Sequence, residues 1–230
     1  MIIAECCTNW RDLGEAKRLI EAAKECGAGL VKFQLYDAEA DRGKPHYAWV
    51  KAHELNLKQA ETLFKYGEKI GIEIFFSVFA PQSVDWCEVI GVKRYKIAST
   101  FQRGPVELDA VIATRKPFIL SIPNETLSNI SHKQLPGLEG SGWLFCPPGY
   151  PPEGFRLPAF NNDSCPYDGF SDHTIGLDAA KIALARGAHL IEKHFVIEHN
   201  PDFPDDAWSM TPWELRELVR WEKVCWELLG

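Results

Sequence analysis

The chain has 230 residues, a formal net charge of −7 and a sequence pI of about 5.5. This balance gives no electrostatic reason to expect nucleic acid, and an anionic substrate would need a local basic pocket. No stretch approaches the roughly 20 apolar residues of a membrane span, and the start MIIAECC lacks the basic region of a signal peptide. We therefore expect a soluble protein that does not cross a membrane.

The seven cysteines argue against a structural metal knuckle and against a disulfide framework. Their number is odd, and no Cys-x-x-Cys pair occurs. Cys6 and Cys7 are adjacent, and several of the others lie inside apolar stretches. This pattern is typical of buried thiols in a reducing compartment, so we expect a cytoplasmic location.

Strand-like apolar runs alternate with helical spacing from the first residue onward. In the first half, the order is strand 1–5, helix 12–27, strand 30–36, a long charged and aromatic loop 37–56, helix 57–71, strand 72–79, helix 83–91 and strand 92–99. Gly27, Gly71 and Gly91 follow the helical segments at the positions where glycine ends helices.

The same alternation continues through the second half. The order is helix 105–114, strand 116–123, a segment 131–137 too short for a full helix, strand 141–148, an irregular loop over 147–168, strand 169–174, helix 177–187, strand 188–197 and helix 211–229. Pro105 begins one of these helices and Gly187 ends another. The last helix carries Thr211 as N-cap, Pro212 in its first turn and Glu214 three residues after the cap.

Eight strands, each followed by a helix or its remnant, predict a single-domain (β/α)₈ TIM barrel over residues 1–230. A doubly wound parallel sheet is the competing architecture. The first strand-to-helix turn has no Gly-x-Gly-x-x-Gly pattern, which disfavours that alternative.

Polar side chains recur where the predicted strands end, which in a barrel is the end that carries the active site. Any one of them alone could be a helix cap, a solvated lysine or a hydrogen-bonded core histidine. Because strand side chains alternate between faces, Lys32 shares a face with Gln34, and Asp172 and Lys193 point the other way. The recurring residues are Glu5, Lys32, Gln34, Ser77, Lys96, Ser99, Ser121, Ser171, His173, Glu192 and His194.

This set of side chains suggests a phosphorylated small molecule that meets a carbonyl compound at a metal. Two lysines and several hydroxyls can hold a phosphate. His173 and His194 can bind a divalent metal, which would polarise a carbonyl group. Glu5 can act as an acid, as a base or in orienting water.

The ordered motifs resemble the sialic acid synthase (N-acetylneuraminate synthase) family along nearly the whole chain. They are MIIAE, AKRLIEAAKECGAGLVKFQ, GIEIFFSVF with SVDW, GVKRYKIAS, KPFILS, GFSDHTIG, LIEKHFV and FPDDAWSMTPWEL. The resemblance implies a TIM barrel that condenses phosphoenolpyruvate with N-acetylmannosamine or a related 2-acetamido sugar. The implied products are phosphate and a nine-carbon acidic sugar.

The resemblance also implies a role for individual residues. His173 and His194 would bind a divalent metal, Mn²⁺ or Mg²⁺. Glu5, Lys32 and Asp205 would be the catalytic residues, and Gln34, Tyr150 and Asp205 would contact the sugar. Phosphoenolpyruvate would be held by Lys32, Lys96, Ser99, Ser121 and Ser171.

The sequence departs from the family pattern at three places around the sugar. Ile122, Pro123 and Asn124 stand where Thr-Gly-Met is usual, Thr100 and Phe101 where glycine and glutamate are usual, and CPPGYPP lacks the usual asparagine. The chain also ends without the small antifreeze-like domain of the family.

These departures leave two alternatives open: a barrel synthase that uses another aldehyde, and a binding subunit whose partner is a separate antifreeze-like protein. The three tryptophans of the last helix allow a homodimer, although most of this helix reads as barrel core.

Overall fold

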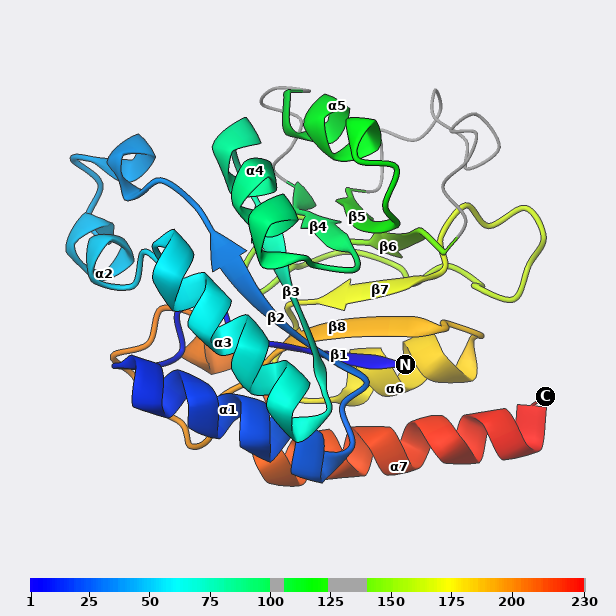
Figure 1. Cartoon of the computed structure of the whole chain (residues 1–230). Coiled ribbons are helices and arrows are strands. Elements are labelled where there is room, and N and C mark those ends of the chain that lie inside the picture. The colour runs from blue at the N-terminus through cyan, green and yellow to red at the C-terminus, as the bar shows by residue number, and fades with distance from the viewer. Residues whose placement is uncertain (100–105, 124–139, 230) are drawn as a thin grey trace.

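The computed structural model of the chain describes residues 1–99, 106–123 and 140–229, and eight parallel strands close into a barrel there (Figure 1). The strand order is β1 to β8, and Glu5 at the end of β1 lies opposite both Lys32 of β2 and His194 of β8. This closure confirms the predicted TIM barrel and excludes the doubly wound sheet. The strands are β1 Ile2–Glu5, β2 Leu30–Leu35, β3 Glu73–Val78, β4 Tyr95–Ile97, β5 Phe118–Ile122, β6 Gly142–Phe145, β7 Gly169–Asp172 and β8 Leu190–His194.

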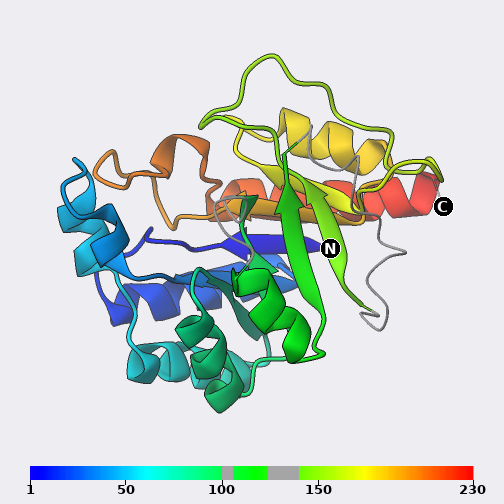
Figure 2. The same ribbon diagram turned by 90° about the horizontal axis from the view of Figure 1, so that it is seen from above.

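The helices lie outside the ring of strands, as the view from above shows (Figure 2). Gly27, Gly71 and Gly91 cap helices in the left-handed conformation, as their spacing predicts. The α-helices are α1 Leu13–Cys26, α2 Tyr47–Ala52, α3 Leu57–Ile70, α4 Pro81–Ile90, α5 Val106–Ala113, α6 Asp178–Ala185 and α7 Pro212–Leu229, with short 3₁₀ turns η1 Ala38–Asp41 and η5 Asp206–Trp208.

Some helical segments differ from the sequence prediction in their presence or their bounds. The segment 37–56, expected as a loop, contains η1 and α2; both are short, and α2 buries none of its residues, so neither shows the apolar periodicity of a packed helix. Helix α4 begins at Pro81, two residues before the predicted start. Pro105 and the segment 131–137 lie outside the described residues.

The inside of the barrel is built in layers by the two-residue alternation of the strands. An apolar layer near the amino ends of the strands comprises Ile3, Leu30, Phe75, Ile119 and Leu144, with Leu190 packed against it. Two residues further along five of these strands, each apolar side chain is followed by a polar one on the same face. The pairs are Ile3 and Glu5, Leu30 and Lys32, Phe75 and Ser77, Ile119 and Ser121, and Leu190 and Glu192.

Helix α7 lies along α1 and α6 and closes the outer layer (Figure 1). Leu215 and Leu218 are fully buried, whereas Trp213 and Trp226 are 74% and 46% exposed. The helix is thus mostly core, with an exposed aromatic margin, and the homodimer stays a prediction. Within the described residues, no helix is both long enough and apolar enough to cross a membrane.

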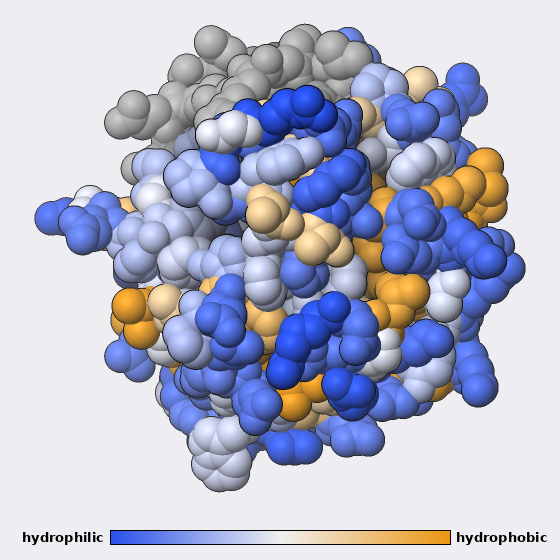
Figure 3. All heavy atoms as spheres, turned by 90° about the vertical axis from the view of Figure 1, so that its left-hand side faces the viewer, coloured by the Kyte–Doolittle hydropathy of each residue, from blue (hydrophilic) through white to orange (hydrophobic). Residues whose placement is uncertain are grey.

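The loops that follow the strands gather on the face shown in Figure 3, where hydrophilic side chains predominate. This face corresponds to the left of Figure 1, where η1 and α2 project after β2.

Candidate functional site

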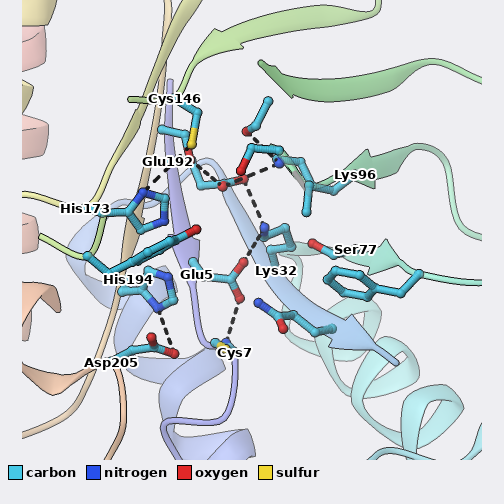
Figure 4. A pocket seen from close by; sticks show the side chains of 17 residues that line it. Glu5, Cys7, Lys32, Ser77, Lys96, Cys146, His173, Glu192, His194 and Asp205 are labelled. Carbon is cyan, nitrogen blue, oxygen red and sulfur yellow. Dashed lines mark hydrogen bonds and ion pairs between the residues drawn. The ribbon is translucent and has the colours of Figure 1, made fainter. Parts of the chain in front are cut away.

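A pocket of about 250 Å³ opens at the carboxyl ends of the strands (Figure 4). It is lined by every residue for which the sequence predicts a site role. These are Glu5, Lys32, Gln34, Lys96, Ser99, Ser121, Tyr150, Ser171, His173, His194 and Asp205. The barrel therefore brings together residues separated by up to 200 positions in the chain.

The deepest part of the pocket is a buried layer of lysines, hydroxyls and one carboxylate. The Lys96 ammonium donates to Ser121 Oγ at 2.7 Å and lies 3.7 Å from Glu192 Oε1. Ser171 Oγ donates to the same Glu192 oxygen at 3.0 Å. Burial alone would raise the pKa of Glu192, but Lys32 and Lys96 hold it below its ordinary value. Glu192 is therefore an anion held between two cations.

Lys32 lies between two carboxylates at the floor of the pocket. Its ammonium forms an ion pair with Glu5 Oε2 and lies 3.1 Å from Glu192 Oε2. Burial lowers the pKa of Lys32 to about 7, with Lys96 adding to this shift and Glu192 opposing it. The other oxygen of Glu5 accepts a hydrogen bond from the backbone N–H of Cys7 at 2.6 Å.

Two histidines and one carboxylate lie nearer the mouth of the pocket. The ring centroids of His173 and His194 are 5.3 Å apart, and His194 Nδ1 is 3.6 Å from Asp205 Oδ2. Burial lowers the pKa of His194 to about 3, and burial together with His194 lowers that of His173 well below its ordinary value. Both rings are therefore neutral at physiological pH, which is the form that binds metals. Tyr150 packs edge-on against His173 at a centroid distance of 4.4 Å.

Further residues line this pocket beyond those predicted from the sequence. Cys7 lines the pocket two residues after Glu5, beyond the end of β1, and its left-handed backbone conformation is not a feature that strand alternation can predict. Cys146, whose sulfur is 4.0 Å from His173 Nδ1, also lines the pocket. Glu192 was placed on the right face, but its position between two lysines depends on distances that one sequence does not contain.

Asp172 and Lys193 point away from the pocket, as strand alternation predicts. Lys193 Nζ lies 3.0 Å from Asp172 Oδ2, and both side chains are essentially inaccessible to solvent. Lys193 also donates to the carbonyl oxygen of Thr174 at 2.7 Å, so the pair is hydrogen-bonded on both sides. This Asp172–Lys193 ion pair links β7 to β8 on the side of the strands opposite to the two site histidines.

Known proteins resemble this chain over most of its length. The chain is 34% identical over 231 residues to an uncharacterized protein of Methanocaldococcus jannaschii, a match covering 95% of this chain and 68% of that protein. It is 31% identical to the N,N'-diacetyllegionaminic acid synthase of Legionella pneumophila (95% and 70% covered) and 27% identical to the human N-acetylneuraminate-9-phosphate synthase (100% and 71% covered).

A solved structure agrees with the sequence matches. The N-acetylneuraminic acid (sialic acid) synthetase of Leptospira borgpetersenii, in complex with citrate, superimposes with a TM-score of 0.84 at 28% identity and covers all of this chain and 84% of that one. The sequence model of the NeuB family matches residues 19–135 and 156–230. The chain therefore belongs to the NeuB family, whose members are phosphoenolpyruvate-using sugar-acid synthases that form a carbon–carbon bond.

Proposed function

We propose that this chain condenses phosphoenolpyruvate with the open-chain form of N-acetylmannosamine or a related 2-acetamido sugar. The products are a nine-carbon acidic sugar and inorganic phosphate. The observation that carries this proposal is one pocket in which a lysine–hydroxyl layer lies directly below a histidine–carboxylate layer. Relatives named as legionaminic, N-acetylneuraminate-9-phosphate and pseudaminic acid synthases support the sugar class.

Phosphoenolpyruvate would bind to the buried layer, through Lys32, Lys96, Ser99, Ser121 and Ser171. Ammonium and hydroxyl groups match phosphate and carboxylate oxygens, and both lysines are almost completely shielded from water. Shielding strengthens each charge contact relative to the same contact in bulk water. Glu192 balances these lysines in the absence of ligand, so binding a more highly charged anion rearranges an existing ion-pair network.

A divalent metal, Mn²⁺ or Mg²⁺ in the simplest assignment, fits the upper layer of the pocket. His194 Nδ1 is buried and has no hydrogen-bond partner among the described residues. Because buried polar atoms usually have a partner, this nitrogen is a candidate metal ligand. His173 and His194 would hold the metal, and it would act as a Lewis acid toward the aldehyde oxygen of the sugar. Gln34, Tyr150 and Asp205 line the same part of the pocket and would orient the sugar.

The reaction joins C3 of phosphoenolpyruvate to the aldehyde carbon, water adds at C2, and the C2–O bond to phosphate breaks. The attacking water, whose oxygen becomes the C2 carbonyl, loses both protons: one ends on the aldehyde oxygen and the other on the departing phosphate. Glu5 and Lys32 share a buried ion pair at the floor of the pocket, and a lysine with a pKa of about 7 can exchange a proton near neutral pH. We assign proton transfer and water orientation to this pair, and contact with the sugar hydroxyls to Asp205.

The test is phosphate release from phosphoenolpyruvate with a divalent metal and a panel of acceptors. We expect release with at least one 2-acetamido hexose and none without an acceptor. His194→Ala should abolish release, whereas His189→Ala should not, because His189 lies before β8 at the opposite end of the barrel. Release with a simple aldose phosphate alone would favour the other-aldehyde alternative, and no release with any 2-acetamido hexose would contradict the proposal.

Location and assembly follow as secondary proposals. All seven cysteines are unpaired, which supports a reducing compartment such as the cytoplasm. A homodimer through the exposed margin of α7, or a separate antifreeze-like protein as partner, stays a prediction. Adding such a small domain to the assay would test the second possibility directly.

A further inference from the structure

Cys7 occupies a constrained position beside the proposed metal site. Its backbone φ is +39°, a left-handed conformation that non-glycine residues seldom adopt. The side chain is only 8% exposed and lines the pocket, two residues beyond Glu5. A strained backbone that aims a reactive side chain into a pocket is typical of functional positions.

Three different elements bring their metal-binding atoms together at this point. Cys7 follows β1, His194 ends β8 and Asp205 precedes η5, yet one ligand atom of each lies within 4.8 Å of the others. Bonds of about 2.0–2.3 Å to one metal would place opposite ligand atoms up to about 4.6 Å apart. The 4.8 Å within which the three atoms lie is close to that limit. Figure 4 shows the side chains of Cys7, His194 and Asp205 beside one another at one end of the pocket.

A second and independent observation indicates a ligand at this point. His194 is 94% buried, since its relative exposure is 6%, and its Nδ1 finds no hydrogen-bond partner among the described residues. The nearest carboxylate oxygen, Asp205 Oδ2, is 3.6 Å away, beyond hydrogen-bond distance. An unbonded nitrogen in so enclosed a place is explained by a cation that the three groups share.

Charge balance favours the same interpretation. A thiolate and a carboxylate together carry two negative charges, which neutralise one divalent cation without help from solvent. His173 is not one of the three clustered groups, although its ring lies 5.3 Å from that of His194. It can complete the site or contact the acceptor. The Cys7 thiolate would add a second negative charge to that of Asp205.

We propose that Cys7 is a thiolate ligand which, with His194 and Asp205, forms a sulfur–nitrogen–oxygen site for Zn²⁺, Fe²⁺ or Co²⁺. The thiol proton passes to solvent when the metal–sulfur bond forms. Thiolate and imidazole ligands select these metals, whereas Mg²⁺ prefers oxygen ligands and retains water. The inference rests on the proposed function for the purpose of the site, and it changes the metal expected there from Mn²⁺ or Mg²⁺ to a thiophilic ion.

Cobalt absorption spectroscopy tests this assignment without substrates. The metal-free chain is titrated with Co²⁺, and a thiolate-to-cobalt charge-transfer band in the near ultraviolet is expected, with visible bands that report the coordination geometry. Cys7→Ser and Cys7→Gly should both lose the near-ultraviolet band and bind Co²⁺ at least about tenfold more weakly. The glycine variant suits the positive φ of this position, and circular dichroism confirms that each variant is folded.

The matched control is Cys146→Ser, which removes the other cysteine sulfur of the same pocket. It should keep the band, Zn²⁺ should displace Co²⁺, and a large excess of Mg²⁺ should not. Cobalt binding without the band, a band that survives Cys7→Gly, or a band lost only in Cys146→Ser would overturn the assignment. Because no phosphoenolpyruvate or sugar is present, a failure of the proposed reaction would leave these spectra unaffected, and the two results are separable.

Discussion

Two groups of buried lysines and carboxylates lie on opposite faces of the same barrel wall. Asp172 and Lys193 face the helix layer, whereas Lys32, Lys96, Glu5 and Glu192 face the pocket. All six charged groups are almost completely shielded from water. Asp172 and Lys193 lie on the helix side of β7 and β8, whereas the pocket-facing groups come from β1, β2, β4 and β8. The polar atoms of the two groups are satisfied to very different degrees.

The helix-side pair is completely hydrogen-bonded. Asp172 Oδ1 accepts from the backbone N–H and the hydroxyl of Thr174 at 2.8 and 2.7 Å, and Oδ2 pairs with Lys193. On the pocket side, the two lysines and two carboxylates also balance, but Ser77 Oγ and His194 Nδ1 find no hydrogen-bond partner among the described residues. Buried polar atoms without hydrogen-bond partners are rare in native proteins. The fully bonded Asp172–Lys193 pair is therefore structural, whereas the unpaired atoms on the pocket side indicate a ligand-binding site.

Asp172→Ala should have the largest effect on stability. It leaves the Lys193 ammonium buried without its counter-charge, and breaking a buried pair costs about 3–5 kcal/mol. We expect a loss of that size in the free energy of unfolding, measured in urea. Molecules that remain folded should bind phosphoenolpyruvate as before. Asp178→Ala, at an exposed position in the first turn of α6, is the control. A loss below about 1 kcal/mol would show that the helix-side pair is not structural.

Lys96→Met should have the opposite result: a large loss of activity and a smaller loss of stability. It removes a cation that the proposed anion site uses, so kcat for phosphate release should fall by about 10²–10³, as when one electrostatic contact to a transition state is lost. The unfolding free energy should fall less than in Asp172→Ala, because Glu192 keeps its ion pair with Lys32 after the contact with Lys96 is lost. Lys93→Met, an exposed lysine before β4, is the control for charge. Unchanged kcat would remove Lys96 from the site.

The sequence was sufficient to predict the pocket floor because the barrel obeys two simple rules. Strand side chains alternate, and the carboxyl ends of parallel strands meet at one edge. These rules placed Glu5, Lys32, Lys96 and His194 together, although no two of these residues are near neighbours in the sequence. They also separated Asp172 and Lys193 from the pocket without any knowledge of distances.

The features that the sequence did not predict depend on loop geometry, about which hydrophobic periodicity gives no information. Helix α2 is short and buries none of its residues, so its sequence lacks the apolar spacing of a packed helix. Cys7 lines the pocket because the backbone after β1 adopts a positive φ at this residue. A cysteine in the sequence does not predict such a conformation. Asp205 approaches His194 from a segment that follows β8 by many residues, and only the family resemblance indicated it.

Lys32 should make binding on the pocket side depend on pH. Burial lowers its pKa to about 7, so above that pH the free protein progressively loses the ammonium charge that the anion needs. The apparent Kd for phosphoenolpyruvate should therefore rise by up to about tenfold per pH unit above neutrality, and binding should take up a proton. Calorimetry in buffers of different ionisation enthalpy measures that proton, and Lys32→Met should lack it. A wild-type Kd independent of pH would contradict the assignment.

Ser77→Ala should change stability only slightly, and in the direction opposite to Asp172→Ala. The Ser77 hydroxyl is fully buried without a hydrogen-bond partner among the described residues, so its removal should stabilise the ligand-free chain by about 1 kcal/mol. Ser83 provides the matched control, because its buried hydroxyl donates to the carbonyl oxygen of Leu35 at 3.0 Å, and Ser83→Ala should destabilise by about 1 kcal/mol. Urea unfolding of the two variants measures both changes. If Ser77→Ala destabilises as much as Ser83→Ala, the hydroxyl contributes to the fold. If Ser77→Ala stabilises the ligand-free chain and this stabilisation shrinks with saturating phosphoenolpyruvate, the Ser77 hydroxyl contributes to ligand binding and lowers the stability of the ligand-free fold.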